Sequence, residues 1–116
     1  MDNSKTYILA LDLKNDESLI SEYEHHHKPG NVWPEIIEGI KACGIQNMKI
    51  YRLGNRLVMV LQTDPDFDLT RDFARMSTLP RQQEWAALML RFQERIPFAG
   101  SDEHWGLMSQ IFDLNA

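Results

Sequence analysis

The chain has one cysteine, no long hydrophobic run and no excess of positive charge. With Cys43 alone, no internal disulfide can form, and its place in an apolar stretch predicts a buried small side chain rather than a reactive thiol. No apolar run approaches the roughly 20 residues that a membrane-spanning helix needs. The first five residues are polar and lead straight into a predicted strand, unlike a secretory signal peptide. We therefore expect a cytoplasmic protein without a membrane partner.

Acidic residues outnumber basic ones, with 17 Asp and Glu against 12 Lys and Arg and a net charge of −5. Nucleic acids and anionic membranes attract clusters of Lys and Arg, whereas the basic residues here are scattered. The sequence therefore predicts that neither is a main partner. A length of 116 residues, 43% of them hydrophobic, predicts one domain over residues 1–116 with a core that needs no disulfide.

Hydrophobic periodicity and turn residues predict the order strand, helix, strand, strand, helix, strand. The hairpin turn is Gly54-Asn55, and Asn15 or Asp16 can cap the first helix. The order predicts a ferredoxin-like α+β domain, a four-stranded antiparallel sheet with helices on one face. The expected strands are Tyr7–Lys14, Asn47–Leu53, Arg56–Thr63 and Met108–Leu114. The expected helices begin near Asp16, Pro34, Leu69 and Pro80. The buried face of the second helix is expected to consist of Ile36, Ile37, Ile40 and Cys43.

The outer strands carry apolar residues on both faces, so a bare outer face would leave a large apolar patch. Two such sheets facing each other would form a dimeric α+β barrel, which predicts a homodimer. Alternatively, one face forms a ligand cleft that is capped by loops.

A dense cluster of ring-bearing and titratable side chains runs from Tyr23 to Glu35 around a Pro-Gly break. On a helix, Tyr23 and His27 project from one face because they lie four residues apart. The histidine triplet lacks the i, i+4 spacing that a helical metal site needs, so we expect no metal. Such a cluster indicates a small polyhydroxylated or aromatic ligand handled by acid–base chemistry. Each residue also has an ordinary structural alternative, such as a core position for Tyr23 or a hydrophobic plug for Trp33.

Several motifs, in order, resemble the L-rhamnose mutarotase family over nearly the whole chain. They are Glu22-Tyr23-x-x-x-His27, Trp33-Pro34-Glu35, Gly44, Ile50-Tyr51, Trp85-x-x-x-Met89 and Ile111-Phe112-x-Leu114. The resemblance implies a small, cofactor-free, cytoplasmic homodimer of ferredoxin-like subunits. It implies an isomerase that interconverts the α and β anomers of a 6-deoxy-L-sugar. It also implies that His27 is the proton donor and that Tyr23 and Trp85 contact the sugar.

The sequence departs from the rhamnose-type pattern at three places. Ala86 stands where the family has a second tryptophan, Met48 stands where rhamnose-handling members have a tyrosine, and Gly30-Asn31 lengthens the segment before Trp33. The run from Met48 to Leu57 is more similar to the L-fucose mutarotase branch. We therefore expect a different sugar pocket, with Met48 in it, and L-fucose as a better substrate than L-rhamnose.

Mutarotation needs one group that protonates the ring oxygen and one that removes a proton from the anomeric hydroxyl. We expect His27 to be the acid and leave the base open between Glu24, Glu35 and a water molecule. Tyr23 would orient a hydroxyl, while Trp33 and Trp85 would cover the apolar face and the 6-methyl group of the sugar. Two alternatives remain on the same architecture: a non-catalytic small-molecule-binding module, and a cofactor-free oxygenase or haem-degrading relative.

Overall fold

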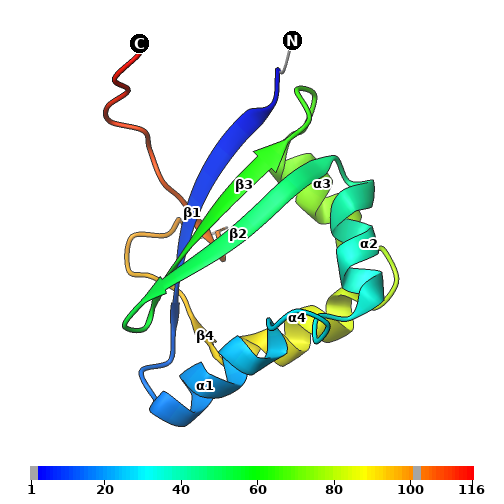
Figure 1. Cartoon of the computed structure of the whole chain (residues 1–116), viewed down its shortest axis with the longest axis vertical. Coiled ribbons are helices and arrows are strands. Elements are labelled where there is room, and N and C mark those ends of the chain that lie inside the picture. Colours follow the sequence, from blue (N-terminus) through cyan, green and yellow to red (C-terminus); the bar gives the residue numbers. More distant parts are fainter. Residues whose placement is uncertain (1–2, 101–102) are drawn as a thin grey trace.

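The computed structural model describes residues 3–100 and 103–116, so the first two residues of the polar N-terminal segment lie outside it. The described residues form five strands and four helices (Figure 1). Their order is β1 (Lys5–Leu13), α1 (Glu17–His26), α2 (Pro34–Ala42), β2 (Ile45–Leu53), β3 (Arg56–Thr63), α3 (Leu69–Met76), α4 (Gln82–Leu90), β4 (Gln93–Glu94) and β5 (Gly106–Leu107).

All strand pairs are antiparallel, and the sheet has the order β2-β3-β1-β4, with β5 also paired to β1. The helices lie on one side of this sheet, with α1 and α4 across one end (Figure 1). The predicted α+β class and antiparallel sheet are confirmed. The prediction of four strands is corrected to five, because the fourth position is shared by two short strands of two residues each. The sheet does not close into a barrel within the single chain.

Strand periodicity explains which face the helices cover. Side chains alternate between faces along a strand, so Leu9, Leu57 and Met59 point to the same side and are buried there against the helices. Two apolar clusters form on this side, and burial of such side chains is the main driving force for folding. One contains Leu9, Ile45, Met59, Leu61 and Phe67; the other contains Leu13, Tyr23, Leu57, Met89 and Phe92.

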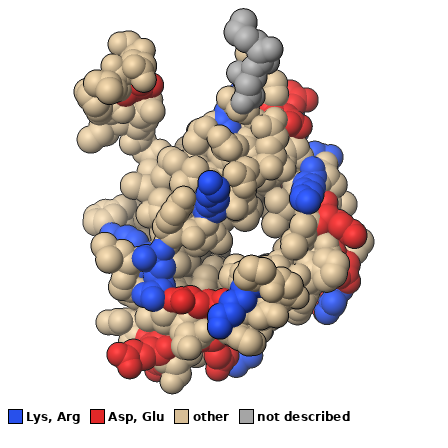
Figure 2. Space-filling model, viewed as in Figure 1, with Lys and Arg blue, Asp and Glu red and all other residues tan. Residues whose placement is uncertain are grey.

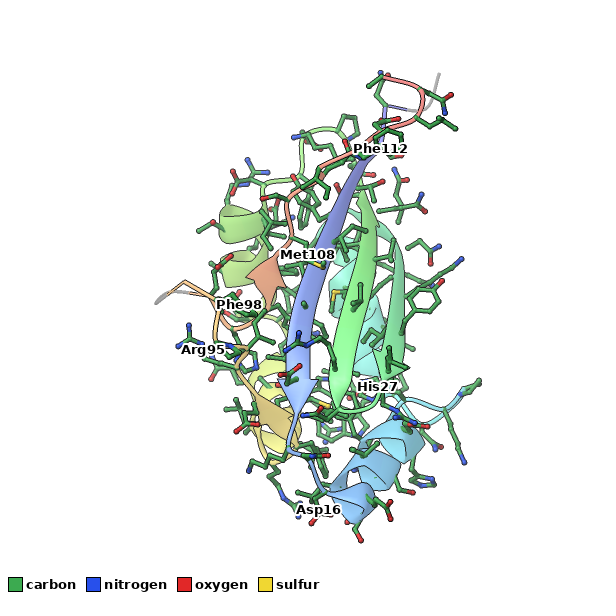
Figure 3. All side chains as sticks on the ribbon, turned by 90° about the vertical axis from the view of Figure 1, so that its left-hand side faces the viewer. Asp16, His27, Arg95, Phe98, Met108 and Phe112 are labelled. Atoms are coloured by element: carbon green, nitrogen blue, oxygen red, sulfur yellow. The ribbon has the colours of Figure 1, made fainter. Side chains whose placement is uncertain are left out.

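The first helix begins and ends as its sequence predicts. The side chain of Asp16 accepts a hydrogen bond from the backbone N–H of Leu19, which satisfies one free donor of the first turn. The helix ends before His27, and Gly30 adopts a positive φ of 86° that favours glycine. Pro34 then opens α2, where its missing N–H costs nothing. The break therefore places His27 at the C-cap of α1, at one end of the sheet (Figure 3).

The predicted buried face of α2 needs one correction. Ile36 and Cys43 are buried and Ile40 is half-buried, but Ile37 is 42% exposed. Successive residues on a helix differ by about 100° in direction, so Ile36 and Ile37 cannot face the same core equally. Cys43 is the buried, free thiol that the sequence predicts.

The predicted final strand Met108–Leu114 is wrong for the single chain. After β5, the N–H of Met108 still donates to the carbonyl oxygen of Ile8, and then the chain leaves the sheet as an irregular tail (Figures 1 and 3). Ile111, Phe112 and Leu114 are 96%, 74% and 81% exposed. Their alternation is typical of a strand, but β1 already pairs with β3 on one side and with β4 and β5 on the other.

None of the described helices combines the length and the apolar character that crossing a membrane requires.

Candidate active site

A cavity of about 920 Å³ lies between the helices and the side of the sheet that they cover. Figure 2 shows an opening at this place, between the sheet and the helices. Most of its wall is apolar and comes from α2, β2, β3 and α4, including Ile36, Ile40, Ile50, Met59 and Met89. The polar and ring-bearing residues on its wall include Tyr23, His27, Gln82, Trp85, Gln93, His104 and Trp105. An apolar cavity with a few polar groups is the usual form of a small-molecule site.

Tyr23 and His27 meet on this wall, as the helical spacing predicts. Their ring centroids are 4.3 Å apart. The Nδ1 atom of His27 lies 2.7 Å from the backbone carbonyl oxygen of Tyr23. A carbonyl can only accept, so Nδ1 carries the proton and donates. In the neutral ring, Nε2 therefore holds the lone pair and is the nitrogen free to exchange protons.

The other two histidines of the triplet differ from His27. His26 is half-buried, with ring centroids 5.6 Å from Phe92 and 6.3 Å from Trp85. His25 is exposed, and neither ring lines this cavity. Consecutive helical positions explain the divergence, since each step turns the side chain by about 100°.

Trp85 lines the cavity, and Trp33 packs against Trp85 without lining the cavity itself. The ring centroids of Trp85 and His27 are 5.7 Å apart, and those of Trp33 and Trp85 are 5.1 Å apart in an edge-to-face arrangement. The guanidinium of Arg81 lies 4.1 Å from the ring centroid of Trp33. The carboxylate of Glu35 is 3.5 Å from Arg81 Nη1. Trp33 and Glu35 thus lie outside the residues that line the cavity, although the sequence interpretation placed both in the pocket.

Two cavity residues that the sequence interpretation missed are Gln93 and His104. The Oε1 atom of Gln93 lies 2.7 Å from Nε2 of His104. The Nε2 atom of Gln93 donates to the hydroxyl of Tyr23 at 3.5 Å. The signal for this pair in the sequence is weak, because His104 stands in a predicted loop and Gln93 follows a predicted helix without a motif of its own. Their approach depends on β4 and β5, both of which pair with β1.

Burial governs the titration of the three ring groups. Burial lowers the pKa of His27 below its ordinary 6.5; its hydrogen bond to the Tyr23 carbonyl opposes this effect, and nearby His26 adds to it. Burial also lowers the pKa of His104, and the positive charge of Arg95 adds to the effect. The pKa of Tyr23 is raised by burial, with an opposing contribution from Gln93. Tyr23 therefore stays protonated near neutral pH and can donate a hydrogen bond.

Two of the three places where the sequence departs from the rhamnose-type pattern lie on the cavity wall: Met48 on β2 and Ala86 on α4. A bulge between Ile45 and Asn47 turns Met48 to the same side as Ile45. Of the carboxylates considered as bases, Glu24 is exposed and pairs with Arg52. Neither Glu24 nor Glu35 is on the cavity wall.

No cluster of three or more His, Cys, Asp or Glu side chains in the described part of the chain could hold a metal ion. The wall of the cavity combines groups that can exchange hydrogen bonds and protons with an apolar, aromatic surface. This combination, on an open antiparallel sheet covered by helices on one side, is typical of a protein that binds a small molecule.

The chain belongs to the L-rhamnose mutarotase family, whose model matches residues 6–114. It is therefore an isomerase of the mutarotase type. An L-fucose mutarotase of Xanthomonas campestris pv. campestris is 41% identical over 106 residues, which cover 91% of this chain and 85% of the relative. A protein of Dictyostelium discoideum is 42% identical over 115 residues, covering 96% of this chain and 90% of that protein.

The fold is also that of a solved relative. The crystal structure of an L-rhamnose mutarotase from Formosa agariphila matches with a TM-score of 0.67 at 14% identity, covering 95% of this chain and 98% of the other.

Proposed function

We propose that this protein interconverts the α and β anomers of a 6-deoxy-L-hexose, with L-fucose preferred over L-rhamnose. The observation that supports this most strongly is the contact between His27 and Tyr23 on the wall of one cavity, beside Trp85. The reaction itself requires only proton transfers. The ring oxygen gains a proton, the anomeric hydroxyl loses one, the ring opens, the C1–C2 bond rotates, and the aldehyde closes on its other face.

His27 is our choice for the group that delivers a proton to the ring oxygen. Its Nδ1–H is held by the Tyr23 carbonyl, so protonation adds a proton at Nε2, the nitrogen left free. The same nitrogen takes the proton back when the ring closes. A positioned acid–base group of this kind contributes roughly 10²–10⁴-fold to a rate.

The aromatic residues would hold the sugar in place. Tyr23, protonated near neutral pH, would donate to a sugar hydroxyl. Trp85 would cover the apolar face and the 6-methyl group, and Trp33 would fix Trp85 through their edge-to-face contact. We assign Glu35 to the support of this wall rather than to the sugar, because its carboxylate holds Arg81 against Trp33.

The preference for L-fucose rests on the cavity wall and on the relatives. Met48 and Ala86 both line the cavity. The cavity therefore lacks the tyrosine that rhamnose-type members have at the position of Met48 and the tryptophan that they have at the position of Ala86. Their loss changes which hydroxyls find a partner, and a site that leaves a polar group unpaired discriminates strongly. The relative from Xanthomonas campestris named an L-fucose mutarotase points the same way.

Exchange NMR on equilibrated sugars tests the proposed function. The rate of exchange between the α and β signals is compared with and without protein for L-fucose, L-rhamnose and D-glucose. We expect acceleration for both 6-deoxy sugars, greater for L-fucose, and little for D-glucose. No acceleration of any 6-deoxy sugar would contradict the function, while faster exchange of L-rhamnose than of L-fucose would contradict the preference.

We also propose a cytoplasmic homodimer, each subunit a single domain over residues 1–116, in which the outer face of the sheet packs on a second copy. Side-chain alternation puts Ile8, Val58 and Val60 on that face, beside exposed Tyr51 and Leu53. A monomer would leave this apolar surface and the apolar tail in water. The tail has a strand pattern but pairs with none of the described strands of its own chain. A second copy supplies one, so residues 108–114 would form a strand there.

Sedimentation velocity tests the dimer. The wild type is expected to sediment as a dimer at micromolar concentration. The double substitution Ile111→Ala and Phe112→Ala should weaken dimerisation at least roughly tenfold, since large apolar anchors carry most interface energy. Phe98→Ala is the matched control, because Phe98 is equally exposed on the loop between β4 and β5 (Figure 3). A monomeric wild type, or equal behaviour of both variants, would contradict this interface.

A further inference from the structure

The proposed reaction moves two protons at two oxygen atoms, and His27 accounts for only one of them. The carboxylates that the sequence offered as partners, Glu24 and Glu35, do not line the cavity. The cavity does contain a second imidazole, that of His104, which enters from the segment just before β5.

The hydrogen bonds of His104 fix which nitrogen is free. Gln93 donates through its Nε2 to the Tyr23 hydroxyl, so its other amide atom, Oε1, faces His104 as an acceptor. An amide oxygen accepts and cannot donate, so His104 donates through Nε2–H. Its Nδ1 therefore carries the lone pair in the neutral ring. His104 is a proton acceptor at Nδ1, held in that tautomer by Gln93.

Tyr23 lies between the two imidazoles and is tied to both. Its backbone carbonyl accepts from Nδ1 of His27, and its hydroxyl accepts from Gln93, which in turn accepts from His104. One helical residue thus sets the tautomers of two rings on the wall of one cavity. Each ring has one nitrogen bonded to protein, and the other nitrogen has no bonded partner among residues 3–100 and 103–116.

We propose that His104 is the second catalytic residue, the base that works with His27 in ring opening. This inference rests on the proposed function. Nδ1 of His104 takes the proton of the anomeric hydroxyl while His27 delivers its Nε2 proton to the ring oxygen, and the C1–O bond to the ring breaks. On closure, the ring hydroxyl returns its proton to His27, and His104 returns its proton to the new anomeric oxygen. The net proton count is unchanged.

The surroundings of the two rings differ. Burial is the main cause that lowers the pKa of both. At His27 the hydrogen bond to the Tyr23 carbonyl opposes this effect and nearby His26 adds to it, whereas at His104 the positive charge of Arg95 adds to it. The carboxylate of Glu103, next to His104 in the chain, accepts from the N–H groups of Gly100 and Leu107. Among the described residues, the other titratable groups near the two rings include His26, Tyr23 and Lys41.

The pH dependence of anomer exchange, corrected for the sugar without protein, tests the pair. The active form has His27 protonated and His104 neutral, so the wild-type rate should be bell-shaped, with its optimum on the acid side of neutrality. A single base would instead give a rate that rises with pH to a plateau. A wild-type plateau without an alkaline limb would overturn the proposal.

Two variants identify His104 as the source of the acid limb. His104→Asn should lower the maximal rate of anomer exchange about 100-fold. It should also remove the acid limb of the pH profile, so that only the decline caused by deprotonation of His27 remains. His25→Asn is the matched control on an exposed histidine and should keep the wild-type curve. Gln93→Glu places a carboxylate on the His104 Nε2–H, so the acid limb should move up by about one pH unit or more. Structural damage alone would not move that limb.

The outcomes separate the two proposals. Wild-type protein that accelerates no 6-deoxy sugar overturns the mutarotase function, and the role of His104 falls with it. An active wild type whose bell shape survives in His104→Asn, or whose acid limb stays in place in Gln93→Glu, overturns only the role of His104.

Discussion

Replacing His27 by Asn is expected to lower the catalysed rate of anomer exchange by roughly 10²–10⁴-fold. The amide nitrogen of Asn can still donate to the Tyr23 carbonyl in place of Nδ1, which lies 2.7 Å from that oxygen in the wild type. The substitution therefore keeps the local hydrogen bond but removes the free Nε2. Exchange NMR on L-fucose measures the rate, and sugar titration measures binding in the same samples.

The control for this experiment is His25→Asn, the same change two residues earlier on an exposed ring outside the cavity. It should leave exchange and binding at wild-type levels. If His27→Asn folds, binds sugar and exchanges anomers at the wild-type rate, the imidazole at this position takes no part in the chemistry. A loss of binding equal to the loss of rate would instead assign His27 to sugar binding.

Phe92→Ala is expected to destabilise the protein by about 3–5 kcal/mol, the largest effect on stability that we predict. Phe92 is fully buried just after α4, and its ring packs against Tyr23 and His26 at centroid distances of 6.1 and 5.6 Å. Truncation leaves a cavity directly behind the site, so both burial and contacts are lost. Urea unfolding followed by circular dichroism gives the free energy of unfolding.

Phe98→Ala is the matched control for Phe92→Ala. The side chain of Phe98 is 83% exposed, so the same truncation should change the free energy of unfolding by less than about 0.5 kcal/mol. Similar losses in both variants would show that the cluster around Tyr23 does not contribute to the core as its burial indicates. The comparison should be made at one protein concentration, because dimerisation also raises apparent stability.

Local signals in the sequence were sufficient for most of the fold. Asp16 caps the first helix, Pro34 opens the second, and Gly54 with Asn55 joins β2 to β3, as predicted. Each of these features depends on a few neighbouring residues, and capping, proline placement and turn formation are local effects. The spacing of Tyr23 and His27 predicted their contact for the same reason, because a single helix carries both.

Contacts between residues far apart in the chain explain where the structure differs from the sequence predictions. The segment Met108–Leu114 has strand periodicity, but periodicity does not say whether a neighbouring strand exists. The sequence interpretation places Trp33 and Glu35 in the pocket, whereas in the structure Trp33 packs against Trp85 and Glu35 lies near Arg81, both outside the residues that line the cavity. Met48 faces the cavity only because a bulge shifts the register of β2 by one residue. None of these placements is a property of a short window of sequence.

The sequence by itself determined the α+β architecture, the family and the pairing of Tyr23 with His27, since helix, turn and motif signals are local. Only the tertiary structure brought Gln93 and His104 to Tyr23. It did so because two short strands distant in the chain pair with β1 and converge on one wall of the cavity. The second imidazole of the site is therefore a product of strand pairing, which depends on contacts between residues far apart in the chain.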